Sequence, residues 1–132
     1  MSNNYETYEV QVYSNGDKLW FQKGKRHRLD GPACEWSDGT KSWWQMGNLH
    51  RLDGPAYEGA DGTKEWYQMG KLHRLDGPAR EWSNGVKNWF IEGKLYSEQE
   101  FNKKINQLNN PTCDGKMVEI EGKKYRLQLV ED

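Results

Sequence analysis

The sequence predicts a mainly β protein, an elongated antiparallel sheet of stacked 23-residue β-hairpin repeats capped by a C-terminal helix and β-hairpin. The first observation is a recurring motif, His-Arg-Leu-Asp-Gly-Pro-Ala, at residues 27–33, 50–56 and 73–79. The second is an Asn-Gly or Asp-Gly pair in each period, flanked by strand-forming residues, which indicates a hairpin. The third is composition: only 34% of residues are hydrophobic, yet the chain has seven Trp and seven Tyr and a net charge of −1. These values favour a folded chain with a thin aromatic core over a disordered one.

The repeat array is expected to cover about four periods, from near Val10 to Tyr96, with the first period degraded. In the second period, residues 32–36 lead into the Asp38-Gly39 turn and residues 41–46 leave it. An Asp-Gly turn of this kind predicts positive φ at both central residues. A second turn at Gly47 precedes a short third strand, and Asp-Gly-Pro then ends the ladder because proline cannot donate a strand hydrogen bond. Residues 1–96 are therefore interpreted as the array, and residues 97–132 as a separate C-terminal segment.

Two aromatic columns run through the periods on opposite faces, since neighbouring residues of a strand point in opposite directions. One column is all tryptophan: Trp20, Trp43, Trp66 and Trp89. The other is mixed: Phe21, Trp44, Tyr67 and Phe90. Identical bulky residues at a fixed step favour a structural stack for the all-tryptophan column. The mixed column is either a second structural layer or an exposed surface.

The C-terminal segment begins with Ser97-Glu98-Gln99-Glu100, which has the spacing of a helix capping box. A helix of about eleven residues follows, with Phe101, Ile105 and Leu108 on one face. Residues 117–121 and 124–130 then read as two strands around Gly122. A repeat array needs an end that covers its last edge strand, so this segment is predicted to be the cap.

The recurring motif carries a histidine, an arginine and an aspartate in every copy. Equivalent residues two strands apart are separated by about 10 Å, too far for one zinc ion to join His27, His50 and His73. We expect these histidines to hydrogen-bond a neighbouring turn. Arginine and aspartate two residues apart share a face when extended, which favours a ladder of ion pairs over a row of guanidinium groups offered to an anionic ligand. The aspartates of this ladder are assigned a structural role: Asp30, Asp53 and Asp76.

Composition and motifs also narrow the function. The chain has no apolar run of about 20 residues, no basic and apolar leader, and no strongly basic charge balance, which argues against membrane insertion, export and general nucleic-acid binding. Two cysteines 79 residues apart form neither a disulfide framework nor a zinc knuckle. No nucleophile motif or phosphate loop is present, and a repeat offers the same groups several times rather than one asymmetric set. We therefore expect a cytoplasmic, non-enzymatic protein without a cofactor or metal.

The unit Gly-x-Leu-His-Arg-Leu-Asp-Gly-Pro-Ala-x-Glu-Trp-x-x-Gly-x-Lys-x-Trp resembles MORN-like repeat variants, which recur in uncharacterised bacterial and tailed-phage proteins. The ending Gly93-Lys94-Leu95-Tyr96-Ser97-Glu98, running into a helix, is similar to how such arrays end. The resemblance covers most of the chain and implies stacked hairpins and a binding role. The period length and the His-Arg-Leu-Asp core differ from ordinary MORN repeats, so lipid binding is not carried over.

The resulting prediction is a protein-binding module, and a phage-type accessory protein that modulates a host factor is its more specific form. A carbohydrate or cell-wall binder and an antitoxin-like protein are the alternatives. The one short helix and hairpin cannot cover a whole array, so part of the mixed column should stay exposed for a partner. The predicted contact residues are Trp44, Tyr67 and Phe90, with Arg51 and Arg74 as a polar rim. The open sheet edge also offers a route to a homo-oligomer.

Overall fold

The computed structural model describes residues 7–109, 117–120 and 123–126 of the chain. Its contacts divide the chain after Glu98 into two compact units, which are described separately. The described residues do not include Cys113. They also leave out residue 121 and residues 127–130 of the predicted C-terminal strands.

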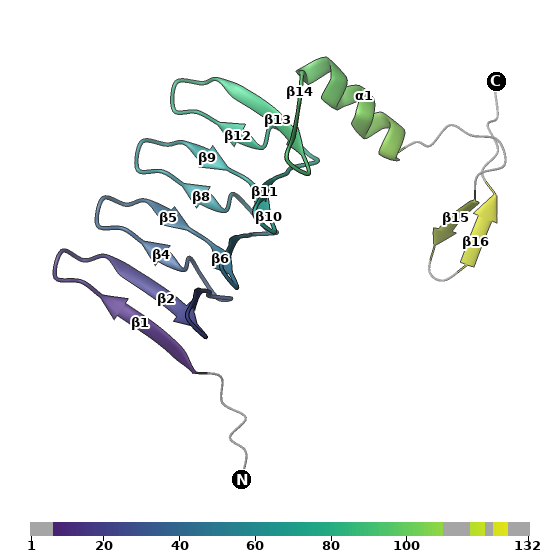
Figure 1. Cartoon of the computed structure of the whole chain (residues 1–132). Helices are drawn as coiled ribbons and strands as arrows, with labels where there is room; N and C mark the ends of the chain where they lie inside the picture. The colour runs from purple at the N-terminus through teal and green to yellow at the C-terminus, as the bar shows by residue number, and fades with distance from the viewer. Residues whose placement is uncertain (1–6, 110–116, 121–122, 127–132) are drawn as a thin grey trace, which may run out of the picture. The chain divides into compact units, whose positions relative to one another are not determined.

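The first unit is an antiparallel sheet whose hairpins follow one another in chain order (Figure 1). It contains ten strands, in the order β1 (Tyr8–Val12), β2 (Lys18–Gln22), β4 (Cys34–Glu35), β5 (Lys41–Ser42), β8 (Tyr57–Glu58), β9 (Lys64–Glu65), β12 (Arg80–Glu81), β13 (Lys87–Ile91) and β14 (Lys94–Tyr96), with β3 (Lys25–Arg26) paired to β2. The predicted fold class, a mainly β chain of antiparallel hairpins with one C-terminal helix, is confirmed.

A second row of short hairpins runs alongside this sheet. It contains β6 (Trp44–Gln45) paired with β7 (Asn48–Leu49), and β10 (Tyr67–Gln68) paired with β11 (Lys71–Leu72). Trp43 lies where the chain passes from the sheet into this row: its N–H donates to Ala56 at 2.7 Å, and its carbonyl accepts from His50 at 3.0 Å. The N–H of Gly47 donates to the carbonyl of Arg26 at 2.9 Å, and Gly70 bonds Leu49 in the same way. Each short hairpin is therefore hydrogen-bonded to the one before it.

The two turns of each period differ from the prediction. At the Asx-Gly turns only the glycines have positive φ, for example 98° at Gly39, and the aspartate is not left-handed. The bonds from Trp36 N–H to Thr40 and from Gly39 N–H to Trp36 define a three-residue loop that ends in a left-handed glycine. Asp38 instead accepts the Thr40 N–H at 2.9 Å, which braces the loop. The expectation of two positive-φ residues at this turn is therefore wrong.

Two successive positive-φ residues occur at the other turn of the period. Met46 has φ 48° and Gly47 has φ 86°, and Met69 with Gly70 repeats the pattern at 50° and 81°. This is the two-residue turn that matches the twist of a tight hairpin. Its first position carries a side chain in every period, a strained choice that needs a compensating contact.

The fully buried core consists of small residues rather than tryptophan. Ala33, Ala56 and Ala79 of the recurring motif are 0% exposed, as is Cys34. Both aromatic columns are half-buried throughout. The indole N–H of Trp44 donates to the hydroxyl of Ser42 at 2.8 Å, and Ser42 is only 5% exposed. Trp44 therefore lies beside a buried polar side chain.

The second unit contains the predicted helix and hairpin. Helix α1 (Glu98–Asn109) begins directly after Ser97, as the capping-box spacing indicates. Phe101 is 2% exposed, whereas Leu108 is 53% exposed, so the predicted apolar face is buried only at its start. Strand β15 (Met117–Ile120) pairs antiparallel with β16 (Lys123–Arg126). The assignment of this unit as a cap stays a prediction. Among the described residues, no helix has the length and apolar character needed to cross a bilayer.

Candidate interaction surfaces

The histidines of the recurring motif hold the strained turns. The Nδ1 of His27 accepts the N–H of Met46 at 3.0 Å, and the Nδ1 of His50 accepts the N–H of Met69 at 2.9 Å. His73 accepts the N–H of Glu92 at 2.9 Å. Each acceptor belongs to one period and each donor to the next, so the predicted bond to a neighbouring turn is confirmed. In the part of the chain that the structure describes, no group of three or more His, Cys, Asp or Glu side chains could hold a metal ion.

The guanidinium groups of the motif arginines lie over the rings of the all-tryptophan column. The guanidinium of Arg51 is 3.8 Å from the ring centre of Trp43, and that of Arg74 is 3.9 Å from Trp66. Arg51 donates from Nε to Asp53 at 2.9 Å and from Nη1 to the carbonyl of Pro55 at 3.0 Å. The predicted ladder of arginine–aspartate pairs is confirmed, and its members are Arg28–Asp30, Arg51–Asp53 and Arg74–Asp76.

The glycine of Asp-Gly-Pro makes room for this arginine. A Cβ at Gly54 would lie 3.0 Å from Cζ of Arg51, and one at Gly77 would lie 2.9 Å from Cζ of Arg74. The guanidinium is therefore held between a tryptophan ring and a residue without a side chain. Stacking on an aromatic ring together with two hydrogen bonds to oxygen fixes an arginine more firmly than a single ion pair does.

The predicted contact residues separate into two groups. Trp44 and Tyr67 begin β6 and β10, and Phe90 lies in β13. Arg51 and Arg74 were expected to form a rim around this mixed column, but their guanidinium groups lie on Trp43 and Trp66 of the other column. That arrangement does not fit a rim around the mixed column, because ring stacking and the bonds inside each loop direct both side chains elsewhere.

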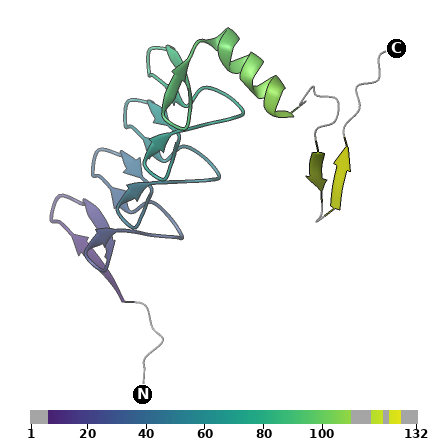
Figure 2. The same ribbon diagram turned by 45° about the vertical axis from the view of Figure 1, so that its right-hand side comes forward.

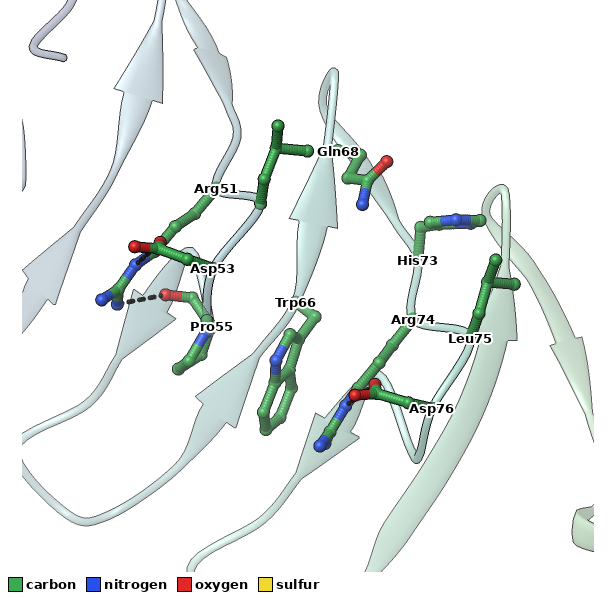
Figure 3. A pocket seen from close by; sticks show the side chains of 11 residues that line it. Arg51, Asp53, Pro55, Trp66, Gln68, His73, Arg74, Leu75 and Asp76 are labelled. Carbon is green, nitrogen blue, oxygen red and sulfur yellow. Dashed lines mark hydrogen bonds and ion pairs between the residues drawn. The ribbon is translucent and has the colours of Figure 1, made fainter. Parts of the chain in front are cut away.

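Arg51 and Arg74 instead line a groove between two successive loops, here named the loop groove. One wall is formed by Arg51, Leu52 and Asp53, and the other by Arg74, Leu75 and Asp76 with Trp66. Figure 3 shows Trp66 between the Arg51–Asp53–Pro55 loop and Arg74. The groove has a volume of about 620 Å³. In Figure 2 these loops project on the side of the stack away from the Asx-Gly turns.

An equivalent groove lies at the start of the array. Trp20, Arg28, Leu29 and Asp30 line a volume of about 420 Å³, with Tyr8 and Val10 of β1 in place of a preceding loop. Leucine side chains at the tips of the loops are exposed in each copy: Leu29 is 65%, Leu52 75% and Leu75 45% exposed. Sequence reasoning missed this leucine row. The sequence does contain a signal for these exposed leucines, since each of them directly precedes an Asp-Gly-Pro turn, and such turns face solvent.

The mixed column forms a second surface, here named the aromatic strip: Trp44, Tyr67 and Phe90 with their cross-strand partners Leu49, Leu72 and Leu95. Direct cross-strand partners share a face, so aromatic and leucine side chains alternate along the strip. Arg26 lies 5.2 Å from the ring centre of Trp44 at one end. Leu95 is 59% exposed at the other end.

The aromatic strip is connected at Tyr67 to two charged side chains, Glu65 and Arg80. Glu65 accepts the Tyr67 hydroxyl at 3.2 Å and Nε of Arg80 at 2.7 Å. Arg80 also lies 5.6 Å from the ring centre of Phe90. Burial raises the pKa of Tyr67, and the Glu65 charge raises it further. The tyrosine hydroxyl therefore stays protonated and acts as a donor to Glu65 at neutral pH.

Some residues beside the aromatic strip differ between periods. Cys34, Tyr57 and Arg80 occupy one equivalent position, and Ser42, Glu65 and Asn88 occupy another. The motif residues on the other side are identical in all three copies. Sequence reasoning concentrated on the identical positions and missed Glu65 and Arg80. An alignment of the periods includes Glu65 and Arg80 among the positions that differ from one period to the next.

A search of protein-family models, curated proteins and solved structures finds no match to the chain.

Proposed function

We propose that the chain is a non-enzymatic protein-binding repeat module and that the aromatic strip contacts the partner. The observation that carries the proposal is that half-buried aromatic side chains, which differ between periods, lie next to Arg26 and Arg80 along the aromatic strip. Trp, Tyr and Arg dominate the binding energy of protein interfaces. A rigid ladder of hairpins also holds these side chains in place before binding, which lowers the entropic cost of association.

The identical side chains are less suited to this role because they are engaged within the array. Arg51 and Arg74 stack on tryptophan and bond their own loops, and His50 accepts an amide of the next period. Replacing them would disturb the scaffold. Trp44, Tyr67 and Phe90 differ from one another, which indicates that the scaffold accepts several aromatic side chains there. Specificity is therefore assigned to the strip.

The resemblance to MORN-like units of tailed-phage proteins supports a finer proposal. In that form the chain is a small accessory protein that acts in the cytoplasm by binding and modulating a host factor. A carbohydrate-binding surface is the competing function, because the rings of Trp44 and Tyr67 lie beside polar side chains such as Glu65, a combination that sugar-binding sites also use.

Site-specific photocrosslinking tests the proposal. A benzoylphenylalanine is placed at Tyr67, and in a second variant at Phe90, and the full chain is expressed in its host cells. We expect both positions to crosslink the same protein. The matched control is Tyr13, which is 49% exposed but lies near the Asn15-Gly16 turn, and it should not give that product.

The double variant Trp44→Ala, Tyr67→Ala should stay folded by circular dichroism and fail to compete for the crosslinked protein. Equal crosslinking from Tyr13 and Tyr67, or unimpaired competition by the double variant, would contradict the proposal. Binding on a glycan array with quenching of tryptophan fluorescence, in the absence of a crosslinked protein, would favour the carbohydrate function.

A further inference from the structure

We propose that the loop groove and its equivalents bind an extended basic peptide, with one lysine or arginine side chain of the peptide in each groove. This surface uses Trp66, Leu52, Leu75 and the motif aspartates, and it is separate from the aromatic strip. The proposal does not depend on the function of the strip.

The more exposed member of each ion pair at the groove is the carboxylate. Each arginine–aspartate pair turns its carboxylate outward: the side chains of Asp53 and Asp76 are 85% exposed, whereas those of Arg51 and Arg74 are 23% and 22% exposed. At the equivalent position of the first copy, the hydrogen bond and charge of Arg28 lower the pKa of Asp30, so this carboxylate is ionised at neutral pH. A solvent-facing row of carboxylates attracts cations and repels the phosphates of nucleic acids.

The remaining groove walls suit the rest of a long basic side chain. Trp66 lines the groove with its ring, and the exposed leucines Leu52 and Leu75 stand at its two walls. Lysine and arginine bury their aliphatic stems against apolar groups while keeping the charged end in a polar environment. The groove therefore provides apolar contact for the stem and carboxylates for the charge.

The spacing of the grooves selects an extended chain. Equivalent loops lie two strands apart in the sheet, a step of about 10 Å. An extended peptide in the polyproline II conformation has three residues per turn and advances about 3.1 Å per residue, so residues three apart lie on one side of it and about 9 Å apart, close to one step between loops. The groove at Trp20, with Leu29 and Asp30, has the same motif residues as the one at Trp66 and lies two periods before it, so peptide residues six apart reach both. A peptide with basic residues at every third position matches this spacing.

Binding of synthetic peptides to the full chain tests this inference. The probe is a twelve-residue peptide with lysine at every third position in a serine and proline background, measured by calorimetry and by tryptophan fluorescence at low salt. We expect it to bind at least tenfold more tightly than a peptide with the same number of lysines at every second position. A peptide with glutamate in place of lysine should not bind.

The variant Asp53→Asn, Asp76→Asn should weaken binding of the lysine peptide at least tenfold. Its matched control is Asp38→Asn, Asp61→Asn, which removes the same charge at the Asx-Gly turns, where other periods have Asn15 and Asn84. The control should change affinity less than twofold. Equal weakening by both variants, no preference for the spacing of three, or tighter binding of a helical peptide with lysine at every seventh position would overturn the inference.

Discussion

Replacing His50 by alanine tests how neighbouring periods are joined. The imidazole of His50 accepts the N–H of Met69 at 2.9 Å, and Met69 is held at φ 50°. Alanine removes the acceptor and leaves a left-handed residue without its partner in the preceding period. The bond crosses from one period to the next, and in repeat proteins such contacts are the terms that couple the units.

The expected loss of stability follows from the surroundings of the bond. A net contribution of about 0.5–1.5 kcal/mol is usual for one hydrogen bond in a folded protein. Met69 is 64% exposed, so water can reach its freed N–H and the larger cost of a buried unpaired donor does not apply. In a unit of this size, 1 kcal/mol corresponds to roughly 4–8 °C in Tm. We therefore expect His50→Ala to lower Tm by about 2–12 °C.

Thermal unfolding and amide hydrogen exchange measure the effect together. The matched control is His50→Asn, since its Oδ1 is attached at the same point as the imidazole Nδ1 and can accept the same N–H. Exchange of the Met69 amide should quicken in His50→Ala and return toward the native rate in His50→Asn. If the two variants lose the same stability and the Met69 amide exchanges equally fast in both, the hydrogen bond is not what couples the periods.

Three further variants test other parts of the array. Gly54→Ala should cost about 1–3 kcal/mol in chemical denaturation, because its Cβ would lie 3.0 Å from Cζ of the stacked Arg51; an unchanged midpoint would show that Arg51 shifts freely. Met69→Gly should raise stability by about 0–1.5 kcal/mol, since relief of the left-handed backbone exceeds the added entropy of the unfolded chain; a clear loss would mean that the methionine side chain contributes packing. The hydrogen bond from the Thr63 N–H lowers the pKa of Asp61 below its ordinary value of 3.8. The unfolded state therefore takes up the proton first, and the stability of the protein falls as the pH drops through that region. Asp61→Asn keeps the acceptor oxygen but does not titrate, so it should reduce this loss of stability in acid unfolding curves.

The order of strands and the pairing inside each period were predictable because they depend on local signals. Asx-Gly pairs, alternating residues and a proline that stops the ladder indicate hairpins without reference to the rest of the chain. The turn types were not predictable in the same way. Met46 and Met69 adopt positive φ because a histidine of the preceding period binds their N–H, and that partner is 19 residues away in sequence.

The candidate site was predicted in part, and two features of it were not: where the arginines lie and which residues are buried. The ion pair of Arg51 with Asp53 follows from their spacing, but its stacking on Trp43 depends on how the loop folds back. For the same reason Arg51 and Arg74 lie over Trp43 and Trp66 and do not form the predicted rim of the mixed column. Burial was also misjudged, since the bulky tryptophans are half-buried and Ala56 is fully buried. Ala56 lies between two neighbouring segments, since its carbonyl accepts the Trp43 N–H and its own N–H donates to Glu65.

Positions that are identical in every period contact one another, and this explains why they do not vary. His50, Arg51 and Gly54 depend on one another's geometry: histidine sets the next turn, arginine stacks on tryptophan, and glycine leaves space for the arginine. A change at one of these positions affects its neighbours, so every copy keeps the same residues. The aromatic strip lies outside this network and combines different rings with single features such as the Glu65–Arg80 pair at 2.7 Å. We therefore expect a partner that recognises one place along the array to contact the strip, whereas a repetitive ligand can bind the loops.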